Sequence, residues 1–160
     1  MPRRQAIRYA GQVYVAFSPM PSAVQSVAGE AIACYVAAVM KNKYSHMRKA
    51  SPEELRALVT LLAKRIEVFE APNGLWSVYN NFVMTPVLGL VYDPTLDQWY
   101  QDYETNDKPV QPIPYDTALD LATELSDIPI SLSEANEFLA AWPELSAVLQ
   151  NDAVPGVLGL

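Results

Sequence analysis

The segment AVQSVAGEAIACYVAAVM, residues 23–40, restricts the fold more than any other part of the chain. Its apolar residues recur at helical spacing and fill many of the remaining positions as well. The segment therefore predicts a helix over residues 23–43 that other elements cover on most sides. One of its faces carries only small side chains, which permit close approach of another element: Gly29, Ala33 and Ala37. We expect this helix at the centre of the fold.

The same segment has about the length needed to cross a bilayer. It contains Glu30, however, and a carboxylate in the middle of a membrane is costly. We therefore predict a buried amphipathic helix and no membrane association. The first residues, MPRRQAIRYAGQ, lack the apolar core of a signal peptide, which leads us to expect a cytoplasmic protein.

The segment IEVFEAPNGLWSVYNNF, residues 66–82, has two interpretations. Asn73-Gly74 between runs of β-forming residues is a strong short-range hairpin signal. The apolar spacing of the preceding segment also continues into it, so a single helix over residues 52–70 is the alternative. We predict a helix that ends near Lys64, followed by a hairpin of residues 66–71 and 75–82. In the hairpin, Trp76, Tyr79 and Phe82 are expected to be first of all sheet-building residues.

The remaining elements follow from apolar spacing and turn residues. We expect a strand over residues 7–17 with a bulge or tight bend at Gly11, an N-cap at Ser22, and strands at 86–92 and 97–103. A loop with three prolines follows at 105–115, and Asp116 is expected to cap a short helix that runs to about Leu125. A last helix begins at Ser131 or Ser133 and is kinked or interrupted at Pro143. Ser51-Pro52-Glu53-Glu54 predicts a capping box at the start of the second helix.

Together these elements predict an α+β fold with an antiparallel sheet of about four to six strands packed with about four helices. We expect a single domain over residues 1–160 with an apolar C-terminal tail at about 151–160. A chain of 160 residues buries roughly 70% of its surface on folding, so it needs no metal or disulfide for stability.

The charge is divided unevenly along the chain. Residues 1–65 carry ten Lys or Arg and three acids, a net charge of +7, whereas residues 66–160 carry one base and fifteen acids, a net charge of −14. The two parts either face each other inside one domain, or give the molecule a basic and an acidic face that attract copies of itself or a charged partner. Because the bases are scattered and the acidic part repels phosphates, nucleic-acid binding is not expected.

Several kinds of chemistry have little support in the sequence. Cys34 and His46 are the only residues of their types, whereas a structural zinc site needs about four ligands. Cys34 lies in the apolar helix and is expected to be inert core, and His46 is expected to be a solvated turn residue. No glycine-rich phosphate loop is present. We therefore predict no cofactor, no metal and no catalytic residues.

The acidic residues between 93 and 107 leave an enzymatic alternative open. Five carboxylates lie close together in sequence: Asp93, Asp97, Asp102, Glu104 and Asp107. Paired carboxylates can hydrolyse glycosides or hold a divalent cation. The run from Asp102 lacks the glycine and the final glutamate of an EF-hand loop, which favours a solvated acidic strand and loop.

Aromatic residues next to these acids suggest a surface for a protein partner. Trp99 and Tyr100 are adjacent in a predicted strand, so their side chains point to opposite faces and both cannot be core on a one-sided sheet. Aromatic side chains are enriched at protein interfaces. The candidate partner-binding residues are Trp99, Tyr100, Asp102, Tyr103 and Glu104.

From these features we predict a non-enzymatic protein-interaction or assembly component that acts through an aromatic and acidic sheet surface. A subunit of a viral or other multi-protein assembly fits this description, and self-association into a homo-oligomer is expected. A small acidic inhibitor or immunity-type protein that sequesters a basic partner is the first alternative. A carboxylate-based hydrolase or metal enzyme that uses the region Asp93–Asp107 is the second.

Overall fold

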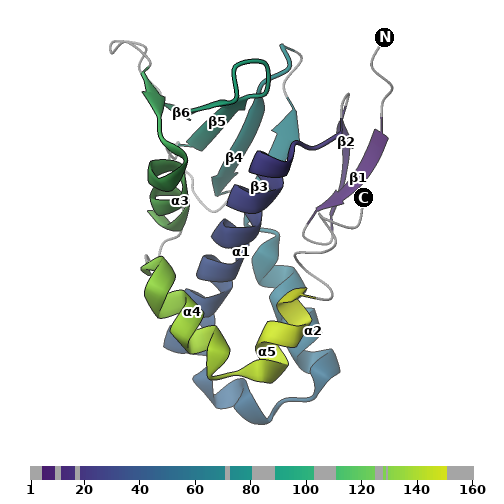
Figure 1. Cartoon of the computed structure of the whole chain (residues 1–160). Helices are drawn as coiled ribbons and strands as arrows, with labels where there is room; N and C mark the ends of the chain where they lie inside the picture. Colours follow the sequence, from purple (N-terminus) through teal and green to yellow (C-terminus); the bar gives the residue numbers. More distant parts are fainter. Residues whose placement is uncertain are drawn as a thin grey trace.

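The computed structural model describes residues 5–9, 12–16, 19–70, 73–80, 89–102, 111–124, 128 and 130–150 (Figure 1). Its strands are β1 (Gln5–Tyr9), β2 (Gln12–Ala16), β3 (Ile66–Glu70), β4 (Trp76–Asn80), β5 (Gly89–Asp93), β6 (Gln98–Asp102) and β7 (Pro112–Ile113). Its helices are α1 (Ser22–Lys43), the 3-10 helix η1 (Ser45–Lys49), α2 (Pro52–Ala63), α3 (Tyr115–Glu124), α4 (Leu132–Ala140) and α5 (Pro143–Val148). This arrangement confirms the predicted α+β class.

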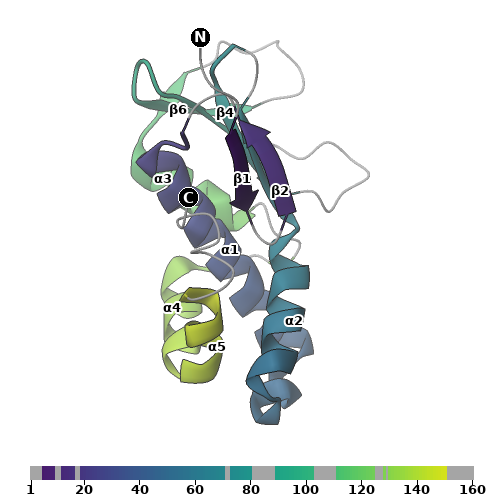
Figure 2. The ribbon, with the colours of Figure 1, turned by 90° about the vertical axis from the view of Figure 1, so that its right-hand side faces the viewer.

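The helix α1 is the central element, as its sequence predicts. It packs against the strands β3 and β4 and against the helices α2, α3 and α4. The sheet and α3 surround its N-terminal half, whereas α2, α4 and α5 surround its C-terminal half (Figures 1 and 2). By length and composition α1 could cross a membrane, but two thirds of its most apolar stretch, 67%, is buried inside the protein. The elements around α1 therefore cover most of its apolar surface.

The five-stranded sheet is an antiparallel meander. Its strands lie in the order β3-β4-β5-β6-β7, so each strand pairs with the next one along the chain. The register pairs Val68 with Val78, Val78 with Leu90, and Tyr92 with Trp99. Because side chains alternate along a strand, these residues share one face of the sheet. That face is buried and joins the main hydrophobic core beneath α1 and α3.

The hairpin interpretation of residues 66–82 is confirmed. The helix α2 ends at Ala63, and β3 and β4 pair from Ile66 with Asn80 to Glu70 with Trp76. At the tip, Gly74 has a φ of +87°, a conformation that glycine adopts without steric cost. The Asn73 side chain accepts a hydrogen bond from the backbone N–H of Leu75, and Trp76 is buried as a sheet-building residue. Phe82 lies outside the described residues.

The predicted helix starts are partly confirmed. The Ser51 hydroxyl accepts from the backbone N–H of Glu54, and the Glu54 carboxylate accepts from the backbone N–H of Ser51, which completes the capping box. The Ser131 hydroxyl caps α4 by accepting a hydrogen bond from the backbone N–H of Glu134. The helix is interrupted after Ala140, and α5 begins at Pro143. Ser22 is instead the first residue of α1, and Pro21 occupies the cap position without a side-chain bond.

Three further expectations were wrong in part or in detail. Residues 7–17 are not one continuous strand: β1 and β2 pair as a hairpin with Tyr9 opposite Gln12, a reversal that agrees with the tight bend expected near Gly11. Asp116 does not cap α3, because that helix already begins at Tyr115. The expected loop at 105–115 contains β7, whose Ile113 pairs with Trp99. The predicted strand 86–92 is seen as β5 from Gly89, and residues 86–88 and the tail 151–160 lie outside the described residues.

Candidate functional site

The aromatic pair predicted to bind a partner is split between the two faces of the sheet. Trp99 is 3% exposed, faces the helices and packs on Tyr92 with a distance of 4.9 Å between ring centroids. Its ring is therefore part of the core. Tyr100 lies on the opposite face, is half-buried, and its hydroxyl donates a hydrogen bond of 2.7 Å to Oε1 of Gln98. Only Tyr100 of this pair offers a contact surface.

The acidic members of the predicted surface are less well placed. Asp102 is the last residue of β6, and Tyr103 and Glu104 lie outside the described residues. The structure therefore brings Trp99 and Tyr100 together only as neighbours on one strand. Among the side chains described on this strand, Trp99 and Tyr100 do not converge on one site.

The carboxylates of Asp93 and Asp97 form hydrogen bonds at the turn between β5 and β6. The Asp93 carboxylate accepts hydrogen bonds from the backbone N–H groups of Thr95 and Leu96. Asp97 has a positive φ of 51° and accepts a hydrogen bond of 2.5 Å from the Tyr92 hydroxyl. Burial, followed by the bond to Asp97, raises the pKa of Tyr92 to about 12. Within the described part of the chain, no group of three or more potential ligands could hold a metal ion.

Cys34 and His46 lie where the sequence predicts. The Cys34 side chain is 1% exposed and packs in a small cluster where α1 meets α4, with Ala37, Ala38, Ile130 and Ala135. Burial, with a smaller contribution from Glu30, raises the pKa of the Cys34 thiol to about 12. His46 lies exposed in η1.

We expect Cys34 to be unreactive in the folded protein. At pH 8 a thiol with this pKa has very little thiolate, so alkylation by iodoacetamide should be about a hundredfold slower than in urea, or slower still. Since the folded pKa is raised from 9.0, its contribution to stability is complete below about pH 9 and is lost as the pH rises toward 12. Mass spectrometry of timed alkylation reactions measures the rate, and equal rates with and without urea would contradict the burial.

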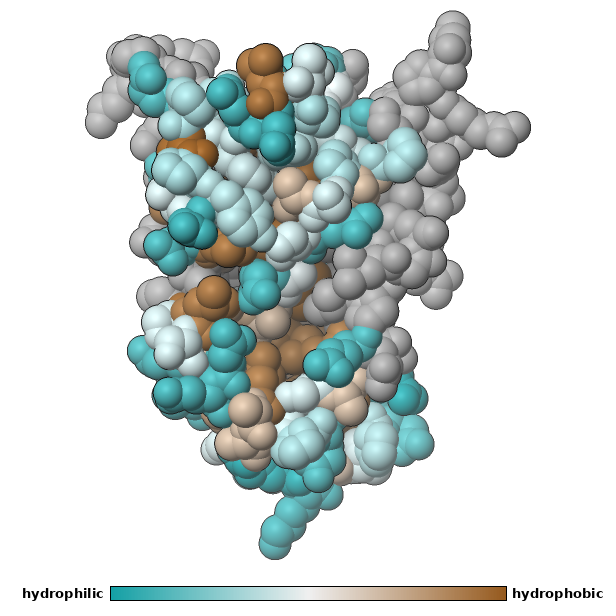
Figure 3. Space-filling model, in the orientation of Figure 1, coloured by the Kyte–Doolittle hydropathy of each residue, from teal (hydrophilic) through white to brown (hydrophobic). Residues whose placement is uncertain are grey.

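A groove along α1 has the form of a binding site. It has a volume of about 460 Å³, and we call it the α1 groove. It is lined by Gln25, Ser26, Gly29, Glu30 and Ala33 of α1 and by Asn136, Leu139, Ser146, Leu149 and Gln150 of the α4–α5 region. In the orientation of Figure 1, hydrophobic residues lie at the base of a hollow between α4 and α5 (Figure 3).

The small side chains of α1 explain where the groove lies. The small-residue face carries Ala37, which is fully buried, and Ala33 and Gly29, which are half-buried. At Ala37 the helix α4 approaches closely through Ala135, so this part of the face is covered. One and two turns earlier, at Ala33 and Gly29, the same face lines the groove. A small-residue face that one neighbour covers only in part therefore leaves room for another element.

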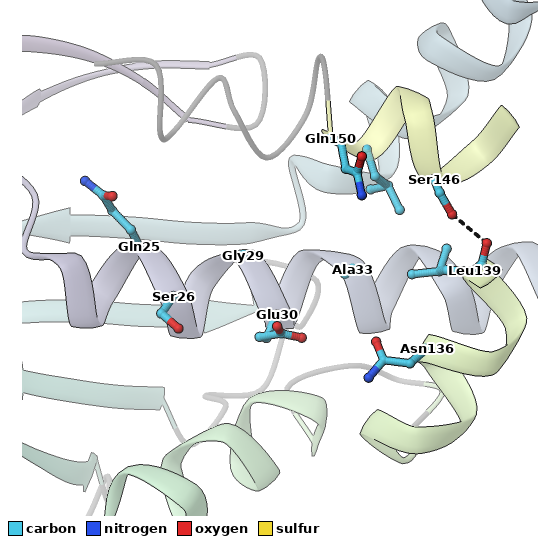
Figure 4. Close-up of a pocket in the computed structure, with 10 residues that line it drawn as sticks. Gln25, Ser26, Gly29, Glu30, Ala33, Asn136, Leu139, Ser146 and Gln150 are labelled. Atoms are coloured by element: carbon cyan, nitrogen blue, oxygen red, sulfur yellow. Dashed lines mark hydrogen bonds between the residues drawn. The ribbon is translucent and has the colours of Figure 1, made fainter. Parts of the chain in front are cut away.

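The second wall of the groove is held by the corner between α4 and α5. Trp142 is 1% exposed and meets Phe138 edge to face, with ring centroids 5.9 Å apart. The Arg48 guanidinium of η1 lies 4.9 Å from the Trp142 ring and donates a hydrogen bond of 3.2 Å to the Ala141 carbonyl. On the inner side, the Ser146 hydroxyl donates to the Leu139 carbonyl (Figure 4). These contacts fix the two helices that form this wall.

Polar side chains stand along both sides of the groove. Figure 4 shows Gln25 and Gln150 on one side of α1, Glu30 and Asn136 on the other, and Gly29 and Ala33 between them. Gln25 donates to the Met20 carbonyl, and the Ser26 hydroxyl is hydrogen-bonded to the Tyr115 hydroxyl. The groove thus combines a floor of small and apolar side chains with polar edges, which are suited to an occupant that has an apolar face and backbone amides.

The described lining lacks the parts of a nucleophilic site. It contains two hydroxyls, Ser26 and Ser146, and one carboxylate, Glu30, but no histidine, lysine or cysteine among these residues. Both hydroxyls are already bonded, to Tyr115 and to the Leu139 carbonyl. An adjacent base is what activates a serine nucleophile, and the described lining places no histidine or lysine beside either hydroxyl. The sequence had indicated only the small-residue face, because the second wall depends on packing of distant residues.

The comparisons with known proteins add no functional information. No protein-family model, no curated protein and no solved structure matches the chain.

Proposed function

We propose that the protein is a non-enzymatic protein-interaction component that holds an apolar segment of a protein chain in the α1 groove. The observation that carries this proposal is the open small-residue face of α1, at Gly29 and Ala33, between polar edges. A central helix that is apolar on most sides has one face that the described elements leave uncovered. Burial of this face by a partner would stabilise the complex through the hydrophobic effect.

The chemistry of the groove favours a peptide segment with small or aliphatic side chains. Without large side chains at Gly29 and Ala33, the backbone of a partner can approach the helix closely. Glu30, Asn136 and Gln150 can then bond the partner's backbone N–H and C=O groups, which would otherwise be buried without a partner. A segment with acidic side chains is disfavoured because Glu30 is the charged group of the described lining.

The α1 groove replaces the aromatic and acidic strand as the candidate surface for a partner. Trp99 is in the core, and the acids of the β5–β6 turn bond to their own backbone or to Tyr92. The charged parts of the chain also interleave, because Arg48 of the basic part contacts the corner between α4 and α5 in the acidic part. Arg48 meets aromatic rings and a backbone carbonyl there, so the contact joins the two parts of the chain without pairing opposite charges.

A peptide library tests the proposal without knowledge of the natural partner. We expect random peptides selected on the full chain to be enriched in uncharged segments with small and aliphatic residues. Ala33→Trp should fill the groove and weaken their binding at least tenfold, which corresponds to about 1.4 kcal/mol. Leu61→Trp is the matched control, since Leu61 is 62% exposed on α2 and does not line the groove. Failure to enrich peptides, or binding that survives Ala33→Trp, would contradict the proposal.

Self-association remains a prediction and has its own measurement. Light scattering after size exclusion gives the molar mass at low and at high salt. An oligomer joined by apolar surface should keep its mass in high salt, whereas one joined by charges should dissociate. A mass of 17.7 kDa in both conditions would exclude a homo-oligomer and leave a different chain as the partner.

A further inference from the structure

We infer that the partner segment held in the α1 groove carries a lysine or arginine side chain whose cation pairs with Glu30. This inference rests on the proposed function, because it names the chemistry of the segment that the groove would hold. The uncharged stretch of the segment lies on Gly29 and Ala33. The basic residue stands beside this stretch, at the edge of the groove that Glu30 and Asn136 form (Figure 4).

Glu30 is a carboxylate that has no partner in the described part of the chain. Its side chain is half-buried in the groove lining and makes no hydrogen bond or ion pair with a described residue. On a helix, a base that pairs with a carboxylate usually stands three or four positions away. At Glu30 these positions hold Ser26, Val27, Ala33 and Cys34. The helix α1 therefore supplies no cation of its own for this carboxylate.

An apolar segment in the groove would remove water from Glu30. A carboxylate that loses water without gaining a partner is strongly destabilised, so the segment must bring a group that replaces this water. A backbone N–H replaces one hydrogen bond, whereas a lysine ammonium or an arginine guanidinium also neutralises the charge. Both basic side chains have long apolar stems, which can cover the groove floor while the cation stays at the edge.

The helices around the groove strengthen the preference for a cation. They contain no lysine or arginine, and exposed acidic side chains lie on all three of α3, α4 and α5: Asp116, Asp120, Glu134, Glu137 and Glu144. Glu137 follows Asn136 of the groove lining. Asp116 follows Tyr115, whose hydroxyl is hydrogen-bonded to that of Ser26 in the lining. The negative potential of these helices adds to that of the carboxylate in the lining and attracts a cation to the groove.

The bases described near the groove do not pair with Glu30. Arg48 reaches the corner between α4 and α5, but it lies over the Phe138 and Trp142 rings and is not part of the groove lining. Lys41 is the first base after Glu30 on α1, and it stands about 16 Å further along the helix axis at a rise of 1.5 Å per residue. Salt at physiological strength screens charges over about 8 Å. The charge of Glu30 is therefore left for a partner to neutralise.

A double-mutant cycle with a selected peptide tests the pairing. The basic residue of the peptide is replaced by methionine, and Glu30→Gln replaces the carboxylate by a neutral side chain of similar shape. Glu53→Gln is the matched control, because Glu53 is an exposed carboxylate at the start of α2 and does not line the groove. Titration calorimetry should show that Glu30→Gln weakens binding of the basic peptide about tenfold and leaves binding of the methionine peptide nearly unchanged. Glu53→Gln should weaken neither.

A second selection, on the chain with Glu30→Lys, gives an independent reading. The enriched peptides should then carry aspartate or glutamate where those selected on the original chain carry lysine or arginine. Three results would overturn the inference and leave the proposed function standing: peptides that Ala33→Trp displaces but that show no enrichment of basic residues, equal effects of Glu30→Gln on both peptides, or equal effects of Glu30→Gln and Glu53→Gln. Absence of any binding peptide would contradict the proposed function and the inference together.

Discussion

Trp99→Ala is expected to lower the free energy of unfolding by about 3–5 kcal/mol, the usual cost of removing a large buried aromatic side chain. Trp99 is 3% exposed and packs on Tyr92, which itself is 5% exposed. The substitution removes this ring contact and leaves a cavity between the sheet and the helices. Urea denaturation followed by circular dichroism measures the change.

Tyr100→Ala is the matched comparison on the same strand. Tyr100 faces the other side of the sheet and is half-buried, and its hydroxyl donates a hydrogen bond to Gln98. Its loss should cost about 1 kcal/mol, close to the net value of one hydrogen bond with some packing. Equal effects of the two substitutions would mean that the faces of β6 are not as described. A small effect of Trp99→Ala would restore Trp99 as a candidate surface residue.

Trp142→Ala should have an effect of similar size on the other half of the molecule. Trp142 is 1% exposed, and it supports Phe138, Arg48 and the corner between α4 and α5. We expect a loss of about 3–5 kcal/mol in the free energy of unfolding. Because this corner holds one wall of the α1 groove, the variant should also bind a selected peptide more weakly at a temperature where it is still folded.

Arg48→Met separates the charge of this contact from its packing. The methionine keeps an apolar stem but loses the guanidinium over the rings and the hydrogen bond to the Ala141 carbonyl. A loss of about 1 kcal/mol is expected, since an exposed cation–π contact contributes about 0.5–1 kcal/mol. Thermal unfolding measures the stability of the Arg48→Met and Trp142→Ala variants. If Arg48→Met were as destabilising as Trp142→Ala, the charge and not the buried ring would hold the corner.

The elements with local signals could be predicted from the sequence. Asn73-Gly74 between β-forming residues indicated the β3–β4 hairpin, and Ser51 with Glu54 indicated the start of α2. Both depend on residues a few positions apart, so local chemistry decides them. The position of α1 at the centre followed from its many apolar faces.

Elements that depend on distant partners were harder to predict. Residues 7–17 alternate like one strand, and Gly11 indicates a bulge or a bend without deciding that the chain turns back to pair Tyr9 with Gln12. Pro112-Ile113 carries a proline, which argues against a strand, yet an edge position beside β6 accepts it. Tertiary context overrides local preference at such places.

In the candidate site, too, some features follow from local sequence and others depend on distant residues. Alternation along β6 predicted that Trp99 and Tyr100 could not both be core, but only the packing of helices on the sheet decides that Trp99 is the buried one. The small residues Gly29 and Ala33 were recognised as a close-approach face. The groove itself needs Asn136, Leu149 and Gln150, more than a hundred positions away along the chain, to form its other wall.

The dependence of α1 on late parts of the chain has a consequence for synthesis. Its main helical neighbours include α3 and α4, which begin at residues 115 and 132, whereas α1 ends at Lys43. At about 5–20 residues per second, a ribosome needs several seconds to supply these neighbours. During this interval the apolar faces of α1 have no native cover, and the nascent chain should be a substrate for chaperones that recognise exposed apolar segments. Synthesis in an extract depleted of such chaperones should therefore increase aggregation, even though the finished protein folds around this helix.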